Sequence, residues 1–249
     1  MSLIAYRASD GADIESFSVS TTEWDTMAQE NRINPPGTYR MYGTHAPVIF
    51  KRSLRGLQFF AHWPHTSDHF SKPKSEQHYL AQIGIVQALR NAGFHAQLEY
   101  RGTSDGEAWQ ADVYCEALGR RIVFEIQLTQ QPLQEYQERT ARYHHAGMKC
   151  VWLIRSPGHF FAFRRALIAR GLVPYSLITQ GVKWPGVQAL PALPLDVGNP
   201  RAPSINDMKV TVFDCDGNAP QISVTAFATG VANGRLRFSR NQWLWDRSQ

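Results

Sequence analysis

Cysteine is scarce in this sequence: three of the 249 residues are cysteines, at positions 115, 150 and 215. An odd number of widely spaced cysteines provides no disulfide framework, and the spacing does not match a zinc site with cysteine ligands. Cys115 and Cys150 lie in apolar, strand-like runs, so we expect them to be reduced thiols in a protein core. This expectation favours a cytosolic location.

Long apolar runs are absent as well. No window approaches the roughly 20 apolar residues needed to span a bilayer. The opening stretch, "MSLIAYRASDGADIE", has no basic region followed by an apolar one, which is the pattern of a secretory signal. We therefore expect a cytoplasmic protein that does not interact with membranes.

Basic residues outnumber acidic ones by a small margin. The 26 lysines and arginines against 21 aspartates and glutamates give a formal net charge of +5 and a pI near 9.2. This balance is compatible with a polyanionic partner, since lysine and arginine attract phosphates. Charge alone does not identify such a partner, because many basic proteins bind no nucleic acid.

The patterns along the chain divide it into three segments. Residues 1–74 contain turn signals such as "NPPGTY" and short strand-like runs, which predict a small β-rich N-terminal lobe. Residues 75–189 alternate helix and strand signals and predict an α/β core. Residues 190–249 hold most of the Pro-rich stretch "ALPALPLDVGNPRAPS" and then strand-like "KVTVFD", "QISVTAF" and "RLRFS". They predict a linker followed by a β-rich appendage.

Helix and strand signals in the middle segment follow a definite order. Ser75 is a good N-cap for a helix whose apolar residues recur at helical spacing as far as Gly93. Strands follow at "FHAQLEY", "WQADVYCEAL" and "RIVFEIQLT", the last two joined by a hairpin turn at Gly119-Arg120. Pro132 opens a second helix, and "KCVWLIR" is the next strand. A helix between two strands implies a crossover, so part of the sheet is predicted to be parallel and covered by helices.

Two acidic residues interrupt the apolar strands of the predicted hairpin. Period-2 alternation places Glu125 and Gln127 on one face of "RRIVFEIQLTQQ", and Asp112 lies on the preceding strand. Counting from the turn predicts that Asp112 and Glu125 are diagonal neighbours on a shared face. Converging carboxylates repel each other unless a hard cation lies between them, and Mg²⁺ suits oxygen ligands. Glu76, in the first turn of the preceding helix, is a candidate third carboxylate.

A structural interpretation of these acids stays open beside the metal site. Buried charges are usually paired, so Asp112 and Glu125 would form ion pairs with a nearby arginine (Arg120, Arg121 or Arg139). For Glu76 the alternative is an N-terminal carboxylate favoured by the helix dipole.

The order of elements resembles the PD-(D/E)xK nuclease fold, and more narrowly the segment resembles the competence protein CoiA-like family. The similar features are "ADV", "EIQ" at 125–127, the helix bearing Arg139 and Tyr143, the strand "KCVWLI" and the upstream "RGLQFFAHWPH". The resemblance covers roughly residues 39–155. It implies a restriction-endonuclease-like core with a mixed central sheet flanked by helices.

The resemblance also implies roles for individual residues. Asp112, Glu125 and the backbone carbonyl of Ile126 would coordinate the catalytic metal, and Glu76 would support the site from its helix. Gln127 stands where the wider superfamily has a lysine that orients or activates the attacking water. A glutamine cannot carry the positive charge, although it can hydrogen-bond a water or a phosphate oxygen.

Nucleic-acid contacts are expected from two regions. Arg139 and Tyr143 lie one helical turn apart and share a face, where the arginine fork suits a phosphate; the alternative is ordinary packing on the helix surface. The stretch around "HWPHTSDHF" is basic and aromatic and suits a nucleic-acid backbone with stacked bases. Its alternatives are a small hydrophobic hairpin and a zinc site at His62, His65 and His69. The contact residues predicted in this stretch are His62, His65, Lys72 and Lys74.

We therefore expect a Mg²⁺- or Mn²⁺-dependent deoxyribonuclease that cleaves single- or double-stranded DNA. The resemblance implies a role in competence, recombination or the processing of incoming DNA, with recombination or DNA-uptake proteins as partners. Two alternatives remain open. One is a nuclease-like module that binds DNA or protein without cutting, which Gln127 in place of lysine favours; the other is a nuclease that defends against foreign DNA.

Overall fold

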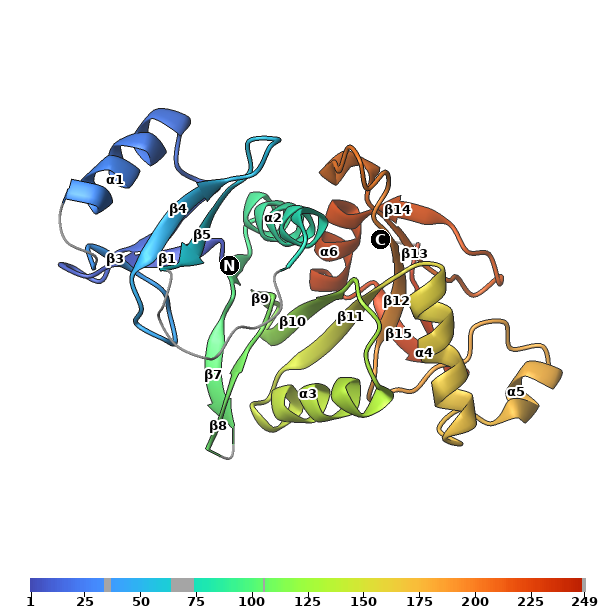
Figure 1. Cartoon of the computed structure of the whole chain (residues 1–249). Helices are drawn as coiled ribbons and strands as arrows, with labels where there is room; N and C mark the ends of the chain where they lie inside the picture. The colour runs from blue at the N-terminus through green and yellow to red at the C-terminus, as the bar shows by residue number, and fades with distance from the viewer. Residues whose placement is uncertain (34–36, 64–73, 105, 248–249) are drawn as a thin grey trace. The chain divides into compact units, whose positions relative to one another are not determined.

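The computed structural model describes residues 1–33, 37–63, 74–104 and 106–247. The chain forms two compact units, Met1–Tyr79 (unit 1) and Leu80–Gln249 (unit 2), whose elements are labelled in Figure 1. None of the described helices has the length and apolar character required to cross a bilayer.

The described residues of unit 1 form short strands and one complete helix. Its elements are β1 (Ile4–Arg7), β2 (Asp13–Glu15), α1 (Thr21–Ile33), β3 (Tyr39–Arg40), β4 (Val48–Arg52) and β5 (Gln58–His62). Strands β2, β1 and β3 form an antiparallel sheet, and β4 and β5 form a hairpin. Trp24 of α1 packs on Phe50 and Phe60 of the hairpin, with ring centroids 4.6 and 5.0 Å away.

Helix α1 was not expected, because the sequence of this lobe predicted strands and turns alone. The helix begins with a capping box. The Ser20 N–H donates to Glu23 Oε2 (3.0 Å), and the Glu23 N–H donates to Ser20 Oγ (3.3 Å). Ser-x-x-Glu is a sequence signal for a helix start, so this helix was predictable. The two strands expected around Arg55-Gly56 are confirmed as β4 and β5.

Unit 2 contains a seven-stranded mixed sheet with the order β14-β13-β12-β11-β10-β9-β6. Its strands are β6 (His95–Leu98), β9 (Val113–Ala117), β10 (Arg120–Gln127), β11 (Lys149–Arg155), β12 (Ala192–Asp196), β13 (Lys209–Thr211) and β14 (Gln221–Ser223). Strands β10, β11 and β12 are mutually parallel, and the neighbouring pairs on both sides are antiparallel.

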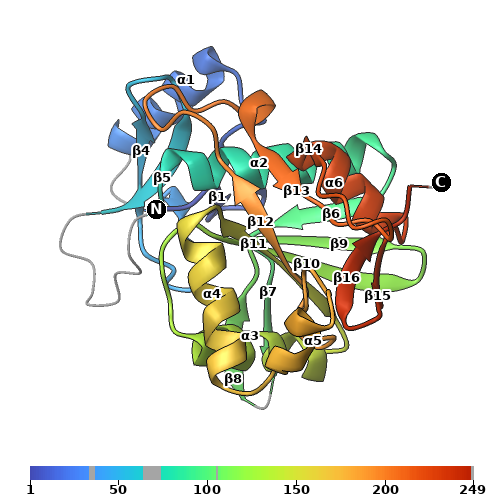
Figure 2. The same cartoon turned by 90° about the vertical axis from the view of Figure 1, so that its right-hand side faces the viewer.

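Helices cover both faces of this sheet, as Figures 1 and 2 show. The helices are α2 (Glu76–Asn91), α3 (Leu133–His145), α4 (Gly158–Ala169), the short α5 (Tyr175–Thr179), α6 (Val224–Ala232) and the 3-10 turn η1 (Ile205–Asp207). Helices α3 and α4 pack on one face of β11, while α2 and α6 lie on the other face of the sheet. Two hairpins complete the unit: β7 (Arg101–Ser104) with β8 (Glu107–Gln110), and β15 (Leu236–Ser239) with β16 (Gln242–Trp245).

The predicted helices and crossover of the middle segment are confirmed, but the strand predicted at "WQADVYCEAL" is divided: β8 ends at Gln110 and β9 begins at Val113. Helix α2 begins after Ser75, whose Oγ accepts a hydrogen bond from the His78 N–H (3.2 Å), and it ends before Gly93 at φ +83°. The β10–α3–β11 connection is a crossover between parallel strands. The sheet face toward α3 and α4 packs an aromatic core, in which Tyr136 contacts both Trp152 and Phe163 at centroid distances of 4.7 and 4.9 Å.

The interpretation of residues 190–249 as a linker and appendage requires correction. The Pro-rich stretch contains β12, which pairs with β11, and β13 and β14 extend the same sheet. Prolines suggested a linker, but Leu193 and Leu195 on either side of Pro194 are fully buried. The run "QISVTAF" is a strand only as far as Ser223. That residue then caps α6 by accepting a hydrogen bond from the Ala226 N–H (3.1 Å).

Candidate active site

The β9–β10 hairpin brings the two predicted metal ligands to the same level of the sheet. Its turn is formed by Leu118 and Gly119, both at positive φ (+52° and +69°), which is the backbone of a tight two-residue hairpin. Val113 pairs with Phe124, so continuing the register places Asp112 across from Glu125. The predicted turn was one residue too late, and the two acids are opposed rather than diagonal.

Asp112 lies at the bend immediately before β9 and is almost completely buried. Its Oδ2 accepts a hydrogen bond from the backbone N–H of Ile126 (2.8 Å). Its Oδ1 accepts one from Nε2 of Gln82 (3.0 Å), which also donates to the Asp112 carbonyl oxygen (3.2 Å). The N–H and C=O of one strand residue point toward the same neighbour. The Ile126 carbonyl therefore points to the side of β10 where Asp112 lies.

Glu125 is fully buried and is bound by two side chains of α3. Its Oε2 forms an ion pair with Nη2 of Arg139 (2.5 Å), and its Oε1 accepts a hydrogen bond from the Tyr143 hydroxyl. That hydroxyl also lies 3.1 Å from the Gln110 carbonyl oxygen. The Arg139 guanidinium stands over the Trp152 ring, 5.0 Å from its centroid. These contacts fix the Glu125 carboxylate in one orientation.

The protonation states of these groups follow from burial and from the carboxylates. Burial lowers the pKa of Arg139, but the nearby Glu125, Tyr143 and Asp112 outweigh it, so that the net pKa is raised and the guanidinium stays charged. Burial, followed by the charge of Glu125, raises the pKa of Tyr143, so that the phenol stays protonated. Burial and Glu125 likewise hold the pKa of the Cys150 thiol well above its usual value. Arg139 is therefore the cation that pairs with Glu125, and Tyr143 and Cys150 stay neutral beside it.

The two carboxylates are held from opposite faces of the sheet, Asp112 just before β9 and Glu125 within β10. Gln82 reaches Asp112 from α2, whereas Arg139 and Tyr143 reach Glu125 from α3. The predicted shared face is therefore only partly realised, because Asp112 lies outside the regular strand. The peptide between Glu125 and Ile126 connects the two acids, since Asp112 accepts its N–H.

The donor atoms suit a hard divalent cation. Mg²⁺ and Mn²⁺ prefer oxygen ligands, and Mg²⁺ keeps several of its waters. The oxygens here are the carboxylates of Asp112 and Glu125 and the carbonyl of Ile126. Each carboxylate oxygen has two lone pairs, so a hydrogen bond does not exclude coordination. Among the described residues, no group of three or more His, Cys, Asp or Glu side chains could hold a metal, so water would have to complete the shell.

Glu76 and Gln127 have local partners. Glu76 lies in the first turn of α2, where Oε1 accepts from Ser53 Oγ (3.0 Å) and Oε2 pairs with Arg55 Nη1 (2.8 Å). These contacts link Glu76 to the β4–β5 hairpin. The Gln127 amide nitrogen donates to the carbonyl and hydroxyl oxygens of Thr129 (2.7 and 3.0 Å). Their catalytic roles remain predictions.

The residues predicted to contact nucleic acid differ in their exposure to solvent. Tyr143 is 1% exposed, so its predicted contact with nucleic acid is replaced by a role in holding Glu125. The Arg139 side chain is 31% exposed although it is paired. His62 lies in β5, where burial lowers its pKa, and Lys74 lies partly buried just before α2. His65, His69 and Lys72 lie outside the described residues, as does most of the zinc site considered for this stretch.

Two buried polar residues beside Asp112 were not recognised in the sequence. Gln82 lies among the apolar residues of α2, and a polar residue on the buried side of a helix is a usable signal. Glu99 follows β6 at φ +47°, and its N–H donates to the Asp112 carbonyl (3.0 Å). Because Leu98 pairs with Val113 and Val113 pairs with Phe124, Glu99 and Asp112 lie just outside β6 and β9 at the level of Glu125.

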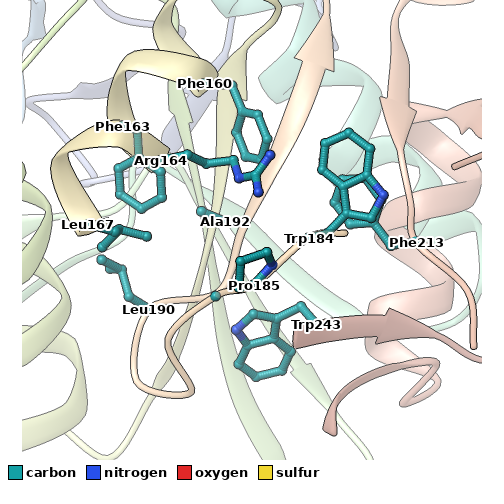
Figure 3. A pocket seen from close by; sticks show the side chains of 11 residues that line it. Phe160, Phe163, Arg164, Leu167, Trp184, Pro185, Leu190, Ala192, Phe213 and Trp243 are labelled. Atoms are coloured by element: carbon teal, nitrogen blue, oxygen red, sulfur yellow. The ribbon is translucent and has the colours of Figure 1, made fainter. Parts of the chain in front are cut away.

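A separate aromatic pocket lies between α4 and the C-terminal half of unit 2 (Figure 3). The Arg164 guanidinium stands 4.9 Å from the centroid of the Trp184 ring, and Trp184 stacks on Phe213 with centroids 4.3 Å apart. The space that admits water is about 20 Å³. This is enough for about one water molecule and too small for a nucleotide.

Comparisons with known proteins bear on the segment that carries the acids. Residues 74–159 match the family model described as "Competence protein CoiA, nuclease-like domain", which confirms the resemblance for that segment. No curated protein matches the sequence significantly. One solved structure, described as "Protein of Unknown Function AF1548", is 14% identical with a TM-score of 0.28; the match covers 37% of this chain and 55% of that one. A similarity at this TM-score says nothing further about fold or function.

Proposed function

From the match of residues 74–159 to the nuclease-like domain of competence protein CoiA, we propose that this chain is a metal-dependent nuclease with a PD-(D/E)xK core. The observation that carries the proposal is the placement of Asp112. Its carboxylate accepts the Ile126 N–H, which brings it beside Glu125 and on the side to which the Ile126 carbonyl points. The carboxylates of Asp112 and Glu125 and the carbonyl of Ile126 would then supply three oxygen donors near the start of β9.

These three oxygens would hold Mg²⁺ or Mn²⁺. When bound, the cation would polarise a phosphoryl oxygen and lower the pKa of a bound water, which are the requirements of phosphodiester hydrolysis. The protein's own residues keep the donors in place beforehand. Gln82 and the Ile126 N–H hold Asp112, and Arg139 and Tyr143 hold Glu125. Such preorganisation avoids the cost of ordering the ligands during the reaction.

Arg139 has a second role in this proposal. Its guanidinium carries five N–H donors, and part of the side chain is exposed next to Glu125. A scissile phosphate at the metal site would lie within reach of the solvent-facing donors, where an arginine fork can make two parallel hydrogen bonds. His62 and Lys74 remain candidates for contacts with nucleic acid, and Glu76 and Gln127 for supporting roles.

DNA is the proposed substrate, in agreement with the basic balance of the chain and the competence context of the matching family. The processing of incoming or recombining DNA is the corresponding biological role. The test is incubation of the purified protein with plasmid, linear duplex and single-stranded DNA, with Mg²⁺, Mn²⁺ or EDTA. Cleavage is expected with either cation and not with EDTA.

The variants Asp112→Asn and Glu125→Gln should each lower cleavage at least about 100-fold, since each removes a charged ligand. Glu138→Gln is the matched control, because Glu138 is an exposed carboxylate next to Arg139 on α3. Cleavage that persists at the wild-type rate in both site variants would assign the activity to another place or to a contaminant.

A second function is supported by a different observation. Both oxygens of Glu125 are already engaged by Arg139 and Tyr143, and the Gln127 amide nitrogen is engaged by Thr129. A site whose polar groups are already paired within the protein fits a nuclease-like module that binds DNA without cutting it. Saturable DNA binding with no hydrolysis under any divalent cation, and no Mn²⁺ binding by the protein, would favour this module over the nuclease.

A further inference from the structure

Gln82 is a fully buried amide on the part of α2 that belongs to unit 2. Its Nε2 donates to two oxygens of the same residue, the Asp112 carboxylate (3.0 Å) and the Asp112 carbonyl (3.2 Å). Two acceptors on the nitrogen fix which end of the amide faces Asp112, since a rotated amide would place its oxygen against two other oxygens.

The other end of this amide has no hydrogen-bond partner in the described part of the chain. Oε1 of Gln82 is buried and receives no hydrogen bond from any described residue. Buried polar atoms are almost always satisfied by protein or by ordered water. The neighbouring carboxylates cannot supply the donor, because ionised Asp112 and Glu125 only accept hydrogen bonds.

We propose that Oε1 of Gln82 accepts a hydrogen bond from a water molecule held beside the Asp112 carboxylate. Gln82 is then a positioning residue with two functions: its nitrogen sets the orientation of Asp112, and its oxygen anchors a water of the site. Resting on the proposed function, this water belongs to the hydration shell of the bound cation. Mg²⁺ retains several waters, and groups that hold such waters tune metal affinity.

This assignment differs from the one predicted from sequence, in which Gln127 meets the water. The amide nitrogen of Gln127 is engaged by Thr129 in the loop that follows β10. Gln82 contacts Asp112 directly and offers an unused oxygen. Of the two glutamines, Gln82 is therefore the one built into the acidic site.

The test compares Gln82→Met with Gln87→Met. Methionine approximates the volume of glutamine without its amide, and Gln87 is an exposed residue on the same helix. Mn²⁺ affinity, measured by electron paramagnetic resonance or calorimetry, should fall at least about tenfold in Gln82→Met, the usual effect of removing a group that supports a metal ligand. It should be unchanged in Gln87→Met, and thermal unfolding should show that both variants are folded.

A metal-free crystal structure of the wild-type protein, at a resolution that shows ordered water, supplies the second readout. A water within hydrogen-bond distance of Gln82 Oε1 is expected. A protein donor there, an empty site, or equal Mn²⁺ affinity of wild type and Gln82→Met would overturn the assignment. If the wild-type protein binds no Mn²⁺, the proposed nuclease function fails. In that case, or if Gln82→Met does not fold, the presence or absence of the water in the crystal structure alone decides the role of Gln82.

Discussion

Arg139 and Glu125 form an ion pair between a helix and a strand in which the carboxylate has no exposed surface, while about a third of the guanidinium side chain remains accessible. The Glu125 charge is thus removed from water, and its balance depends on Arg139 and on the Tyr143 hydroxyl. A buried ion pair adds little to the free energy of unfolding compared with two apolar residues in its place. Removing one partner lowers that free energy strongly, because an uncompensated charge is left in the interior.

Replacing Arg139 by methionine should therefore destabilise unit 2 by about 3 kcal/mol, the low end of the range for broken buried pairs, because Arg139 is partly exposed. Adding Glu125→Gln should restore at least half of the loss. Urea unfolding of the two single variants and the double variant measures the coupling. Arg142→Met is the control, since its contact with the exposed Glu107 is long (3.8 Å) and should matter by less than about 0.5 kcal/mol. Equal losses of stability in Arg139→Met and Arg142→Met would contradict the importance of the buried pair.

Asp112→Ala should cost about 3 kcal/mol, because it leaves the Ile126 N–H and the Gln82 amide without their acceptor in a buried place. Asp112→Asn keeps one acceptor oxygen and should cost about half as much. Hydrogen exchange gives the specific readout: the Ile126 amide should exchange faster in the alanine variant than in the asparagine variant. An Ile126 amide that is equally protected in all three proteins would show that another group satisfies it.

The three cysteines should differ in reactivity. Cys215 is exposed, whereas Cys115 and Cys150 are buried, and a reactive cysteine must be an accessible thiolate. A colorimetric thiol reagent at pH 8 should modify one thiol in the folded protein and all three in denaturant. Rapid modification of two or three thiols in the native protein would mean that the sheet opens around β9 or β11.

Alkaline pH should weaken the fold through Cys115. Burial, followed by the charge of Glu116, raises the pKa of its thiol to about 11. A thiol in the unfolded chain titrates near pH 8.5. The stabilisation from the protonated thiol is thus complete below about pH 8.5 and is lost as the pH rises to 11. Melting temperatures from pH 8 to 11 should fall less steeply in Cys115→Ala than in wild type; parallel curves would rule out this contribution.

The C-terminal segment should be essential to unit 2. Trp245 is buried and stacks on Phe227 of α6 with ring centroids 5.5 Å apart, and its backbone N–H donates to the Phe213 carbonyl (2.6 Å). Trp245→Ala should lower the free energy of unfolding by about 3 kcal/mol, as for other large core truncations. In a chain ending at residue 189, unit 2 should show no cooperative unfolding, since it lacks β12 to β14. Protection of the β10 and β11 amides from hydrogen exchange in that truncated chain would restore the appendage interpretation.

The sequence by itself determined the elements that carry the acids. Ser75 and Gly93 bound α2, Pro132 precedes α3, and strand periodicity marks β10 and β11. These signals are readable because caps, turns and periodicity act between residues close in the chain. The proximity of Asp112 and Glu125 on the two arms of one hairpin was predicted in the same way. A one-residue error in the turn was enough to misplace them from opposed to diagonal.

Only the tertiary structure decided which groups those acids meet. Gln82 is 30 residues from Asp112, and Arg139 is 14 residues from Glu125; periodicity gives the face of an element but not the residue that packs against it. The same limit explains why β12 was predicted to be a linker. Its prolines suggest a linker, and only the tertiary structure shows that this segment pairs with the edge of β11. Long-range pairing depends on the shapes and hydrogen-bonding groups of whole elements, so local pattern alone could not supply it.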